Sequence, residues 1–284
     1  MNPHDFDTAH KPTWCPGCGD FGIWMSLKNA LAKLELTGDD LFIVYGVGCH
    51  ANMVNWMKTY GLAGLHGRSL PVAQGVKMAN HKLPVIAVSG DGDCLGEGGN
   101  HLIHTAKRNT DITVIIHDNQ VYGLTTGQAS PTARPGLKTK STPAGAVDAP
   151  ISPLALAITA GATFVSRGFA GDAKSLTDLI IKAVNHKGFS MVDVLQPCVS
   201  FNKGFDYAWY REHIYDINSE GFKPDNKVKA FEKALEWGDK VPIGIFYEET
   251  RPANEDHESA LSEKTLVDHP LGVKDVDSLL SEFI

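Results

Sequence analysis

The sequence predicts an α/β protein in which a mostly parallel β-sheet is covered by helices on both faces. The first observation is that short apolar runs alternate along the chain with segments whose apolar residues recur at helical spacing. The second is that runs such as "LPVIAVSG" at 83–90 are short, almost wholly apolar and end in glycine, which is typical of buried parallel strands. A three-layer α/β/α arrangement follows.

The elements are expected in a regular order. "GIWMSLKNALAKLEL" at 22–36 carries apolar residues at helical spacing and is the first expected helix. "DLFIVYGV" at 40–47 is a short apolar run and is the first expected strand. Further helices are expected at 71–81, 100–109, 153–161, 172–188 and 227–237, and further strands at 83–90, 111–119, 162–168, 189–197 and 241–249.

Two stretches lie outside this alternation. Residues 122–150 are rich in Gly, Pro, Ser and Thr and have no periodicity. So long a loop inside a compact domain is usually functional or mobile.

From about residue 220 the chain becomes more charged, and its last thirty-odd residues are too polar for a core of their own. We therefore expect a main domain over 1–220 and a C-terminal extension over 221–284. We expect the extension to pack on that domain or on a partner subunit. The alternative is that it ends in a partly disordered tail.

Charge and hydropathy exclude two classes of partner. The net charge of −7 and the absence of a Lys/Arg-rich run argue against nucleic acid. No apolar stretch approaches the roughly 20 residues that span a bilayer. The N-terminal "MNPHDFDTAHKPTW" contains no apolar core of a secretory signal. We expect a cytoplasmic protein that binds neither nucleic acid nor membrane.

Four unusual segments each follow an expected strand, at 46–50, 90–93, 118–124 and 196–202. Ligands of open parallel sheets bind beyond the carboxyl ends of the strands. We therefore expect the four segments to converge on one edge of the sheet and to form the functional site there.

Two of these segments predict a metal–diphosphate clamp. Mg²⁺ prefers oxygen ligands. Asp91 can give a carboxylate oxygen, Asn119 an amide oxygen and Val121 a backbone carbonyl oxygen. Glycines beside Asp91 allow backbone N–H groups to approach a phosphate. Gly-Asp-Gly taken alone is more often a simple turn. Its pairing with "DNQVYG" at the end of the neighbouring strand favours the clamp.

The cysteines leave several kinds of chemistry open. An odd number of cysteines in a chain without a visible export signal disfavours a disulfide framework. Cys-Pro-Gly-Cys at 15–18 suits a metal, an iron–sulfur cluster or a redox dithiol. Zinc could also take four cysteines. The five cysteines are Cys15, Cys18, Cys49, Cys94 and Cys198.

Long motifs carry a resemblance to a known family. They are "WCPGCGDFG" at 14–22, "GVGCH" at 46–50, "TYGLAGLHGRSLPVAQGVKMAN" at 59–80, "GDGDCLGEGGNHLIHTAKRN" at 90–109 and "DNQVYGLTTGQASPT" at 118–132. Gly-Asp-Gly followed about thirty residues later by Asn after a strand is the thiamine diphosphate signature. From about Trp14 to Tyr215 the chain resembles β subunits of 2-oxoacid:ferredoxin oxidoreductases, most closely the two-subunit 2-oxoglutarate type. The resemblance implies the thiamine diphosphate-binding fold for the main domain.

The resemblance also implies cofactors and their contacts. It implies a [4Fe–4S] cluster, Mg²⁺ and thiamine diphosphate, with Cys94 left as a packed free thiol. The implied cluster ligands are Cys15, Cys18, Cys49 and Cys198; the Mg²⁺ ligands are Asp91, Asn119 and Val121; Gly92, Asp93, Gly123 and Leu124 lie along the diphosphate, and Val47, Gly48, Cys49 and His50 beside the thiamine.

Three further residues are candidates for catalysis. His66 and Arg68 in "LHGR" are candidates for diphosphate or substrate contacts, although a lone His or Arg in a loop is more often a surface or packing residue. Asn52 stands where relatives often have a lysine that is linked to recognition of the substrate carboxylate. This departure leaves the preferred 2-oxoacid open.

The resemblance implies coenzyme A-dependent oxidative decarboxylation of 2-oxoglutarate to succinyl-coenzyme A and CO₂, with electrons passing through the cluster to ferredoxin. The reverse carboxylation uses the same site. The family supplies part of its active site from a separate α subunit, so we expect an αβ or α₂β₂ assembly. Three alternatives remain: a pyruvate or broad-range 2-oxoacid enzyme, a thiamine enzyme without redox chemistry, and a non-catalytic iron–sulfur subunit.

Overall fold

An eight-stranded sheet forms the centre of the protein. The computed structural model describes residues 1–270, 272 and 276–283. Every pair of neighbouring strands in the sheet is parallel except β7 and β10, which are antiparallel. The predicted α/β class with a mostly parallel sheet is therefore confirmed. In spatial order the strands are β2 (Tyr60–Ala63), β1 (Phe42–Tyr45), β3 (Val85–Gly90), β4 (Thr113–Asp118), β8 (Ser190–Leu195), β7 (Phe164–Phe169), β10 (Val241–Glu248) and β9 (Ile214–Asp216).

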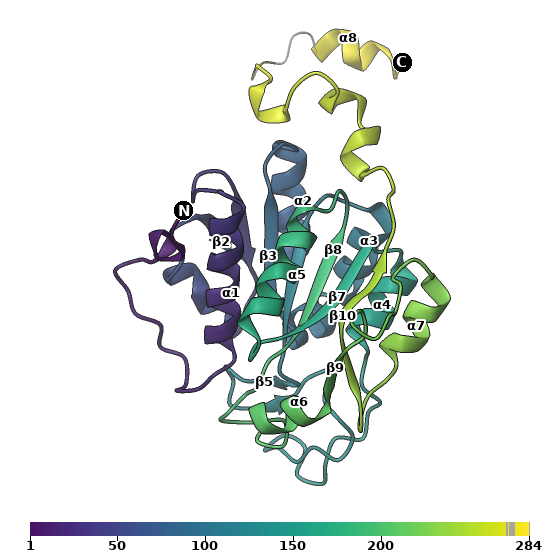
Figure 1. Ribbon diagram of the computed structural model, residues 1–284. Coiled ribbons are helices and arrows are strands. Elements are labelled where there is room, and N and C mark those ends of the chain that lie inside the picture. The colour runs from purple at the N-terminus through teal and green to yellow at the C-terminus, as the bar shows by residue number, and fades with distance from the viewer. Residues whose placement is uncertain (271, 273–275, 284) are drawn as a thin grey trace.

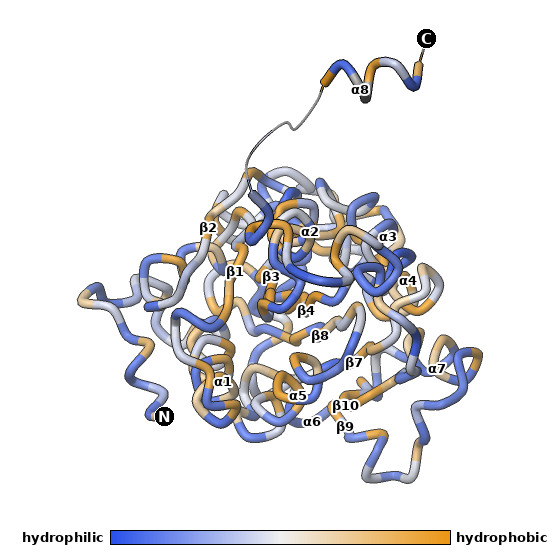
Figure 2. Tube along the Cα trace, turned by 90° about the horizontal axis from the view of Figure 1, so that it is seen from above, coloured by the Kyte–Doolittle hydropathy of each residue, from blue (hydrophilic) through white to orange (hydrophobic). Residues whose placement is uncertain are grey.

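Helices cover both faces of the sheet (Figures 1 and 2). Helices α1 (Asp20–Lys33) and α5 (Ala173–Asn185) pack side by side on one face. The helices of the other face are α2 (Ser69–Ala79), α3 (Gly99–Arg108), α4 (Pro153–Ala160) and α7 (Lys227–Ala234).

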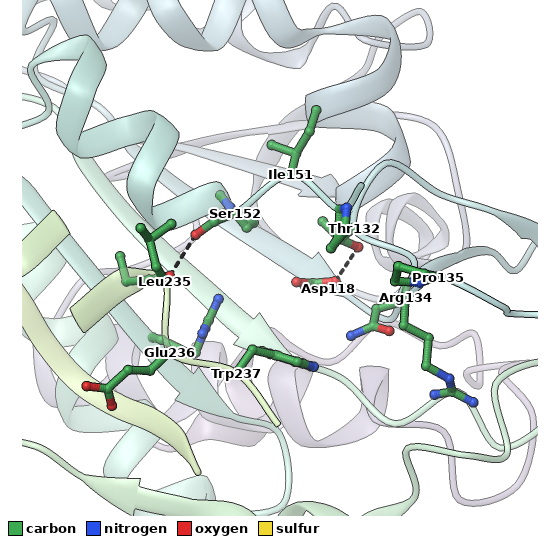
Figure 3. Close-up of a pocket in the computed structure, with 14 residues that line it drawn as sticks. Asp118, Thr132, Arg134, Pro135, Ile151, Ser152, Leu235, Glu236 and Trp237 are labelled. Atoms are coloured by element: carbon green, nitrogen blue, oxygen red, sulfur yellow. Dashed lines mark hydrogen bonds between the residues drawn. The ribbon is translucent and has the colours of Figure 1, made fainter. Parts of the chain in front are cut away.

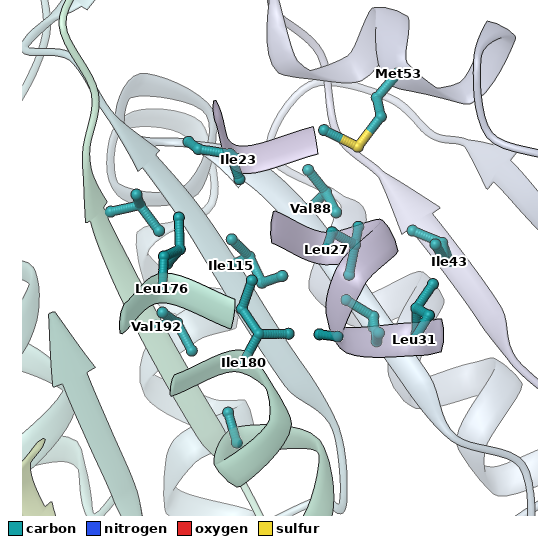
Figure 4. Packing of buried hydrophobic residues seen from close by; sticks show 14 of the residues in the cluster. Ile23, Leu27, Leu31, Ile43, Met53, Val88, Ile115, Leu176, Ile180 and Val192 are labelled. Carbon is teal, nitrogen blue, oxygen red and sulfur yellow. The ribbon is translucent and has the colours of Figure 1, made fainter. Parts of the chain in front are cut away.

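Each helical layer packs on its own apolar core. Leu27 of α1 and Ile180 of α5 lie over Val88, Ile115 and other strand residues of one face (Figure 4). Residues next in sequence on the same strands, such as Val114 and Ile116, belong to the second core. Because successive side chains of a strand point to opposite faces, a strand that is apolar throughout feeds both cores. This explains why the expected strands are continuous apolar runs.

The predicted C-terminal extension contributes to the main sheet. Strand β10 lies between β7 and β9, and α7 packs against α4. Beyond β10 the chain follows the amino-end edge of the sheet, where Asn109 Nδ2 donates to the carbonyls of Arg251 and Pro252. The short helix α8 (Val276–Ser281) stands apart from the body (Figure 2). The division of the chain at residue 220 stays a prediction.

No helix among the described residues is long and apolar enough to cross a membrane.

Several short elements were not expected from the sequence. The unexpected elements are strands β2 and β9, a hairpin of β5 (Val121–Tyr122) and β6 (Gln128–Ala129), helices α6 (Tyr207–His213) and α8, a π-helical segment at Gly92–Glu97, and the short 3₁₀ helices Pro3–Phe6, His50–Asn55, Asn254–His257, Ser259–Leu261 and Leu266–Asp268.

Candidate cofactor site

The segments that follow β1, β3, β4 and β8 meet at one edge of the sheet, as the sequence predicts. They surround a small pocket beyond the carboxyl ends of these strands, next to the β5–β6 hairpin. The position agrees with the general location of ligands in parallel sheets. The pocket is lined by Val47, Gly48, Cys49, His50, Gly90, Asp91, Gly92, Asp93, Asn119, Val121, Tyr122, Gly123 and Gln196.

Asp91 is held firmly at the end of β3. Its side chain is 2 % exposed. Its Oδ2 accepts hydrogen bonds from the main-chain N–H of Gln120 at 2.9 Å and from the hydroxyls of Ser130 and Thr132, each at 2.6 Å. Gln120 has a left-handed backbone with φ of 64°, an unusual conformation for a residue with a side chain. The turn after β4 therefore fixes the carboxylate that ends β3.

Asn119 is oriented by hydrogen bonds at both ends of its amide. Its Nδ2 donates to Gln196 Oε1 at 2.9 Å, and its Oδ1 accepts from the N–H of Val121 at 3.0 Å. Asp91, Asn119 and Val121 all line the same pocket. A carboxylate, an amide oxygen and a carbonyl oxygen form a donor set that suits Mg²⁺, which prefers oxygen ligands. The residues present therefore fit the expected metal–diphosphate clamp.

Two glycines of the pocket are packed closely. A Cβ at Gly92 would lie 2.3 Å from Cε1 of the Tyr122 ring. A Cβ at Gly123 would lie 3.4 Å from Cys49 Sγ and 3.9 Å from Cys198 Sγ. Glycine is thus needed at Gly92 for the ring of Tyr122, and Gly123 leaves the space beside two of the thiols open.

Asp93 connects the loops around the pocket. Its Oδ1 accepts hydrogen bonds from the N–H groups of Gly67 at 2.7 Å and Val47 at 3.1 Å, and its Oδ2 accepts one from Ser89. His50 Nε2 lies 3.7 Å from this carboxylate and accepts a hydrogen bond from the N–H of Gly90 at 3.1 Å. The carboxylate of Asp93 is therefore already bonded within the protein, and its contacts support an organising role.

His66 and Arg68 lie beside this network and are not among the residues that line the pocket. His66 Nδ1 lies 2.9 Å from Asp93 Oδ1 and 3.4 Å from Glu97 Oε2. Arg68 Nη1 donates to the carbonyl of Glu97 at 2.9 Å. The structure turns both side chains toward Asp93 and the segment that follows it. Their contact with diphosphate or substrate stays a prediction.

A second pocket, of about 290 Å³, contains four of the five thiols. Cys15, Cys18, Cys49 and Cys198 come from three distant parts of the sequence and line it together. The other lining residues are Thr13, Trp14, Asp20, Asn52, Asn119, Gly123, Leu124, Thr126, Gln196, Val199, Ser200 and Phe201. Leu124 thus lies at the thiols, whereas it was expected along the diphosphate, and Asn52 lies here as well.

The four thiols have the donor type and number that the expected cluster needs. Burial raises the pKa of Cys49 to about 12 and also raises the pKa values of Cys18 and Cys198. Thiolates here need a bound cation to stabilise them. A [4Fe–4S] cluster binds each thiolate through a different iron atom and needs four of them, so the four thiols fit it.

Cys94 is separate from these four. It lies in the apolar core under α2 and α3, with 2 % of its surface exposed. Burial raises the pKa of its thiol. The structure therefore fits the expectation that Cys94 is a packed free thiol.

A third cavity, of about 190 Å³, adjoins the clamp (Figure 3). The Thr132 hydroxyl that donates to Asp91 also lies 2.8 Å from Asp118 Oδ1, at the cavity wall. Arg167 lines the same cavity, and its Nε donates to Asp193 Oδ2 at 2.8 Å. Burial raises the pKa of Asp118 well above its usual value, and Asp193 and Asp91 add to the shift. Through Thr132 this polar layer is connected to the Asp91 carboxylate of the clamp.

Sequence reasoning missed two contributors to the site. Thr132 bonds to the proposed metal ligand Asp91, and Gln196 bonds to Asn119 and Cys18. Both are uncharged polar residues outside any metal-binding motif. The signals were that Gln196 lies at the end of an expected strand and opens the segment 196–202, and that Thr132 ends the motif "DNQVYGLTTGQASPT" at 118–132.

Comparison with known proteins agrees with this geometry. Residues 46–194 match the family described as thiamine pyrophosphate enzyme, C-terminal TPP binding domain. Residues 198–263 match the family that describes the C-terminal part of the pyruvate ferredoxin oxidoreductase beta chain. The fold and the pocket at the sheet edge thus define a thiamine diphosphate-dependent enzyme.

Individual relatives give a finer assignment. The chain is 42% identical over 269 residues to a 2-oxoacid:ferredoxin oxidoreductase subunit beta of Saccharolobus solfataricus, covering 90% of this chain and 88% of the relative. It is 42% identical over 200 residues to the 2-oxoglutarate oxidoreductase subunit KorB of Mycobacterium tuberculosis, covering 70% of this chain and 54% of that protein. The chain belongs to the family of 2-oxoacid:ferredoxin oxidoreductase β subunits.

A solved structure supports the same family. The 2-oxoglutarate:ferredoxin oxidoreductase from Magnetococcus marinus, with 2-oxoglutarate, coenzyme A and succinyl-CoA bound, superposes with a TM-score of 0.91 at 34% sequence identity. The match covers 99% of this chain and 96% of that one. Since the family consists of β subunits, the chain works with an α subunit.

Proposed function

We propose that this chain is the β subunit of a 2-oxoglutarate:ferredoxin oxidoreductase. The reaction converts 2-oxoglutarate and coenzyme A to succinyl-coenzyme A and CO₂, releases one proton and passes two electrons to ferredoxin. The names of the M. tuberculosis relative and of the Magnetococcus marinus enzyme both specify 2-oxoglutarate. The reverse carboxylation uses the same residues when reduced ferredoxin is in excess.

One observation carries the proposal. The small pocket at the proposed clamp and the thiol pocket share a wall that consists of Cys49, Asn119, Gly123 and Gln196. A site that removes electrons from a substrate and a site that carries them away must lie next to each other. The shared wall supports such a pair within this one chain.

The proposed roles follow from the contacts. Asp91, Asn119 and Val121 would hold Mg²⁺ and through it the diphosphate, and thiamine diphosphate supplies an electron sink for decarboxylation when bound. Gln120, Ser130 and Thr132 fix the Asp91 carboxylate before the metal arrives. Preformed ligands reduce the ordering that binding requires.

The second proposed centre is the cluster on Cys15, Cys18, Cys49 and Cys198. Cys15, which lines this pocket, is exposed to solvent. Exposure of a cluster ligand suits exchange of electrons with an external ferredoxin. All five cysteines are free, as expected of a protein in a reducing compartment such as the cytoplasm.

Substrate preference decides between two candidate functions. Four relatives named as 2-oxoacid enzymes, without a specified acid, are 40–43% identical to this chain, and four named for 2-oxoglutarate are 31–42% identical. The second candidate is therefore a broad-range 2-oxoacid enzyme. Asn52, the candidate for recognition of the substrate carboxylate, lines the thiol pocket.

A panel of substrates tests the assignment. The chain is co-purified with its α subunit without oxygen, and kcat/KM is measured for 2-oxoglutarate, pyruvate and 2-oxobutyrate with coenzyme A and a dye acceptor. A preference for 2-oxoglutarate of more than about tenfold supports the proposal, since one pocket contact is worth about that much. Comparable values for the three acids would establish the broad-range enzyme.

A further inference from the structure

The side chain of Gln196 spans the wall between the two proposed cofactor sites. It follows β8 directly, is 1 % exposed and lines both pockets. Its Nε2 donates to Cys18 Sγ at 3.3 Å, and its Oε1 accepts from Asn119 Nδ2 at 2.9 Å. One amide therefore contacts both a proposed cluster ligand and a proposed metal ligand.

The backbone around Gln196 holds this side chain in place. The main-chain N–H of Gln196 donates to the carbonyl of Asp118 at 2.9 Å. Gly19 packs on its stem so closely that a Cβ there would lie 2.7 Å from Gln196 Cγ. The N–H of Gly19 donates to the carbonyl of Pro197 at 3.1 Å. The segment that leads from Cys18 into α1 is thus fitted to Gln196.

The side-chain amides of Asn119 and Gln196 each have only one orientation that satisfies their contacts when both cofactors are bound. An amide has a donating end and an accepting end. A cation at Asn119 Oδ1 leaves Nδ2 to donate, which requires an acceptor, Gln196 Oε1. The other end of Gln196, Nε2, then donates to Cys18 Sγ. A thiolate at Cys18 accepts hydrogen bonds only and selects the same orientation from the opposite side.

The neighbourhood of Cys18 makes this donor important. In the thiol form Cys18 Sγ donates to Asp20 Oδ2 at 3.3 Å. Once iron replaces the thiol proton, that contact sets a carboxylate against a thiolate. Of these two side-chain contacts of the sulfur, the N–H of Gln196 is then the one that stabilises the negative charge.

We propose that Gln196 is a positioning residue that couples the metal–diphosphate site to the cluster. The inference rests on the proposed function. Hydrogen bonds to cluster sulfurs are one of the factors that set the reduction potential of a cluster. Gln196 raises the potential by donating to Cys18, and Mg²⁺ with thiamine diphosphate strengthens this donation by fixing Asn119. Loading of the cofactor thereby makes the cluster a better electron acceptor.

A redox titration followed by electron paramagnetic resonance tests the coupling. The assembled enzyme is compared with the Gln196→Met variant, which keeps the length of the side chain and loses the amide. Each is titrated with and without Mg²⁺ and thiamine diphosphate. Gln128→Met is the matched control, because Gln128 lies in the β5–β6 hairpin, accepts a hydrogen bond from Thr125 and lines neither pocket.

The expected results have a clear pattern. Wild type and Gln128→Met shift to a more positive cluster potential when Mg²⁺ and thiamine diphosphate are added. Gln196→Met has a more negative potential, shows no shift, and binds Mg²⁺ about tenfold or more weakly, as is usual when a partner of a metal ligand is removed. An unchanged potential in Gln196→Met with an intact cluster would overturn the inference.

Two further outcomes keep the test decisive. If Gln196→Met does not retain a cluster, the wild-type titration alone decides, and the absence of a shift on adding Mg²⁺ and thiamine diphosphate overturns the coupling. If the wild-type protein contains no iron–sulfur signal, the proposed function fails rather than this inference alone.

Discussion

The main-chain N–H of Gln120 donates to Asp91 Oδ2 at 2.9 Å, although the two residues are 29 positions apart in the sequence. The bond joins the ends of neighbouring strands β3 and β4 and keeps the carboxylate facing a pocket that Asn119 and Val121 also line. The oxygen atoms of the proposed cation site are thereby positioned by the fold itself.

Removing the charge of Asp91 tests the clamp. Asp91→Asn keeps the size of the side chain and loses the anionic oxygen that Mg²⁺ prefers. We expect the affinity for Mg²⁺–thiamine diphosphate, measured by calorimetry, to fall by at least about 100-fold, since even indirect partners of a metal ligand are worth 10–100-fold. Iron content should not change. Exposed Asp39→Asn is the control, and equal affinities in the two variants would contradict the clamp.

A methyl group at Gly123 tests the thiol pocket. The added Cβ of Gly123→Ala would lie 3.4 Å from Cys49 Sγ and 3.9 Å from Cys198 Sγ, in the space that a cluster needs. We expect a loss of most bound iron and sulfide in colorimetric assays. Gly75→Ala adds the same methyl group in α2 with no atom within 4 Å. That control should retain the cluster and gain up to about 1 kcal/mol of stability, because alanine is the better helix former.

The cysteines are distinguished by position. Cys198→Ser should bleach or convert the cluster, whereas Cys94→Ala should leave its absorption and iron content unchanged and lower only the melting temperature. Cys94 lies in the apolar core, and loss of buried sulfur there costs packing. An unchanged spectrum in Cys198→Ser together with a bleached Cys94→Ala would transfer the fourth ligand to Cys94.

A buried ion pair at the opposite edge of the sheet gives a prediction on pH. Lys77 Nζ lies 2.9 Å from Asp111 Oδ2, with the two side chains 4% and 20% exposed. Burial acts to raise the pKa of Asp111, but Lys77, the main-chain N–H of Gly188 and Lys187 together outweigh it and hold the pKa below the usual 3.8. A carboxyl whose pKa is lowered by folding stabilises the native state above its unfolded pKa. That stability is lost as the pH falls from about 4 through the lower folded value.

Asp111→Asn should therefore lower the free energy of unfolding at pH 7 by about 3 kcal/mol, the lower end of the range for a broken buried pair. The difference from wild type should shrink as the pH falls below about 4. Denaturant titrations at a series of pH values measure it. Asp178→Asn removes the exposed pair with Lys33 and should cost less than about 1 kcal/mol. A constant difference across pH would contradict the assignment.

The fold was largely predictable because its signal is repeated along the chain. Strands β1, β3, β4, β7, β8 and β10 are buried on both faces, are mostly apolar and alternate with helices, so the alternation is visible without tertiary information. Strand β2 was missed because all four of its residues, Tyr60–Ala63, are exposed at the sheet edge. The β5–β6 hairpin was missed because each strand has two residues.

The site was predictable where chemistry leaves a mark on residue type. Asp91, Asn119 and the cysteines stand in motifs directly after strands, and the parallel sheet brings those ends together. Gln196 and Thr132 are ordinary polar residues in the sequence. Their importance arises from contacts with residues that are distant in the sequence. Gln196 contacts Asn119, 77 positions away, and Thr132 contacts Asp91, 41 positions away. Spacing alone does not reveal such contacts.

The central claim is that one chain holds adjacent thiamine diphosphate and iron–sulfur centres. It is tested most directly by electron paramagnetic resonance of the anaerobic, assembled enzyme frozen after addition of 2-oxoglutarate and coenzyme A. We expect a reduced [4Fe–4S] signal that requires both Mg²⁺–thiamine diphosphate and the substrate and that disappears in Asp91→Asn. A protein that contains zinc in place of iron, or a signal that forms equally without thiamine diphosphate, would contradict the account.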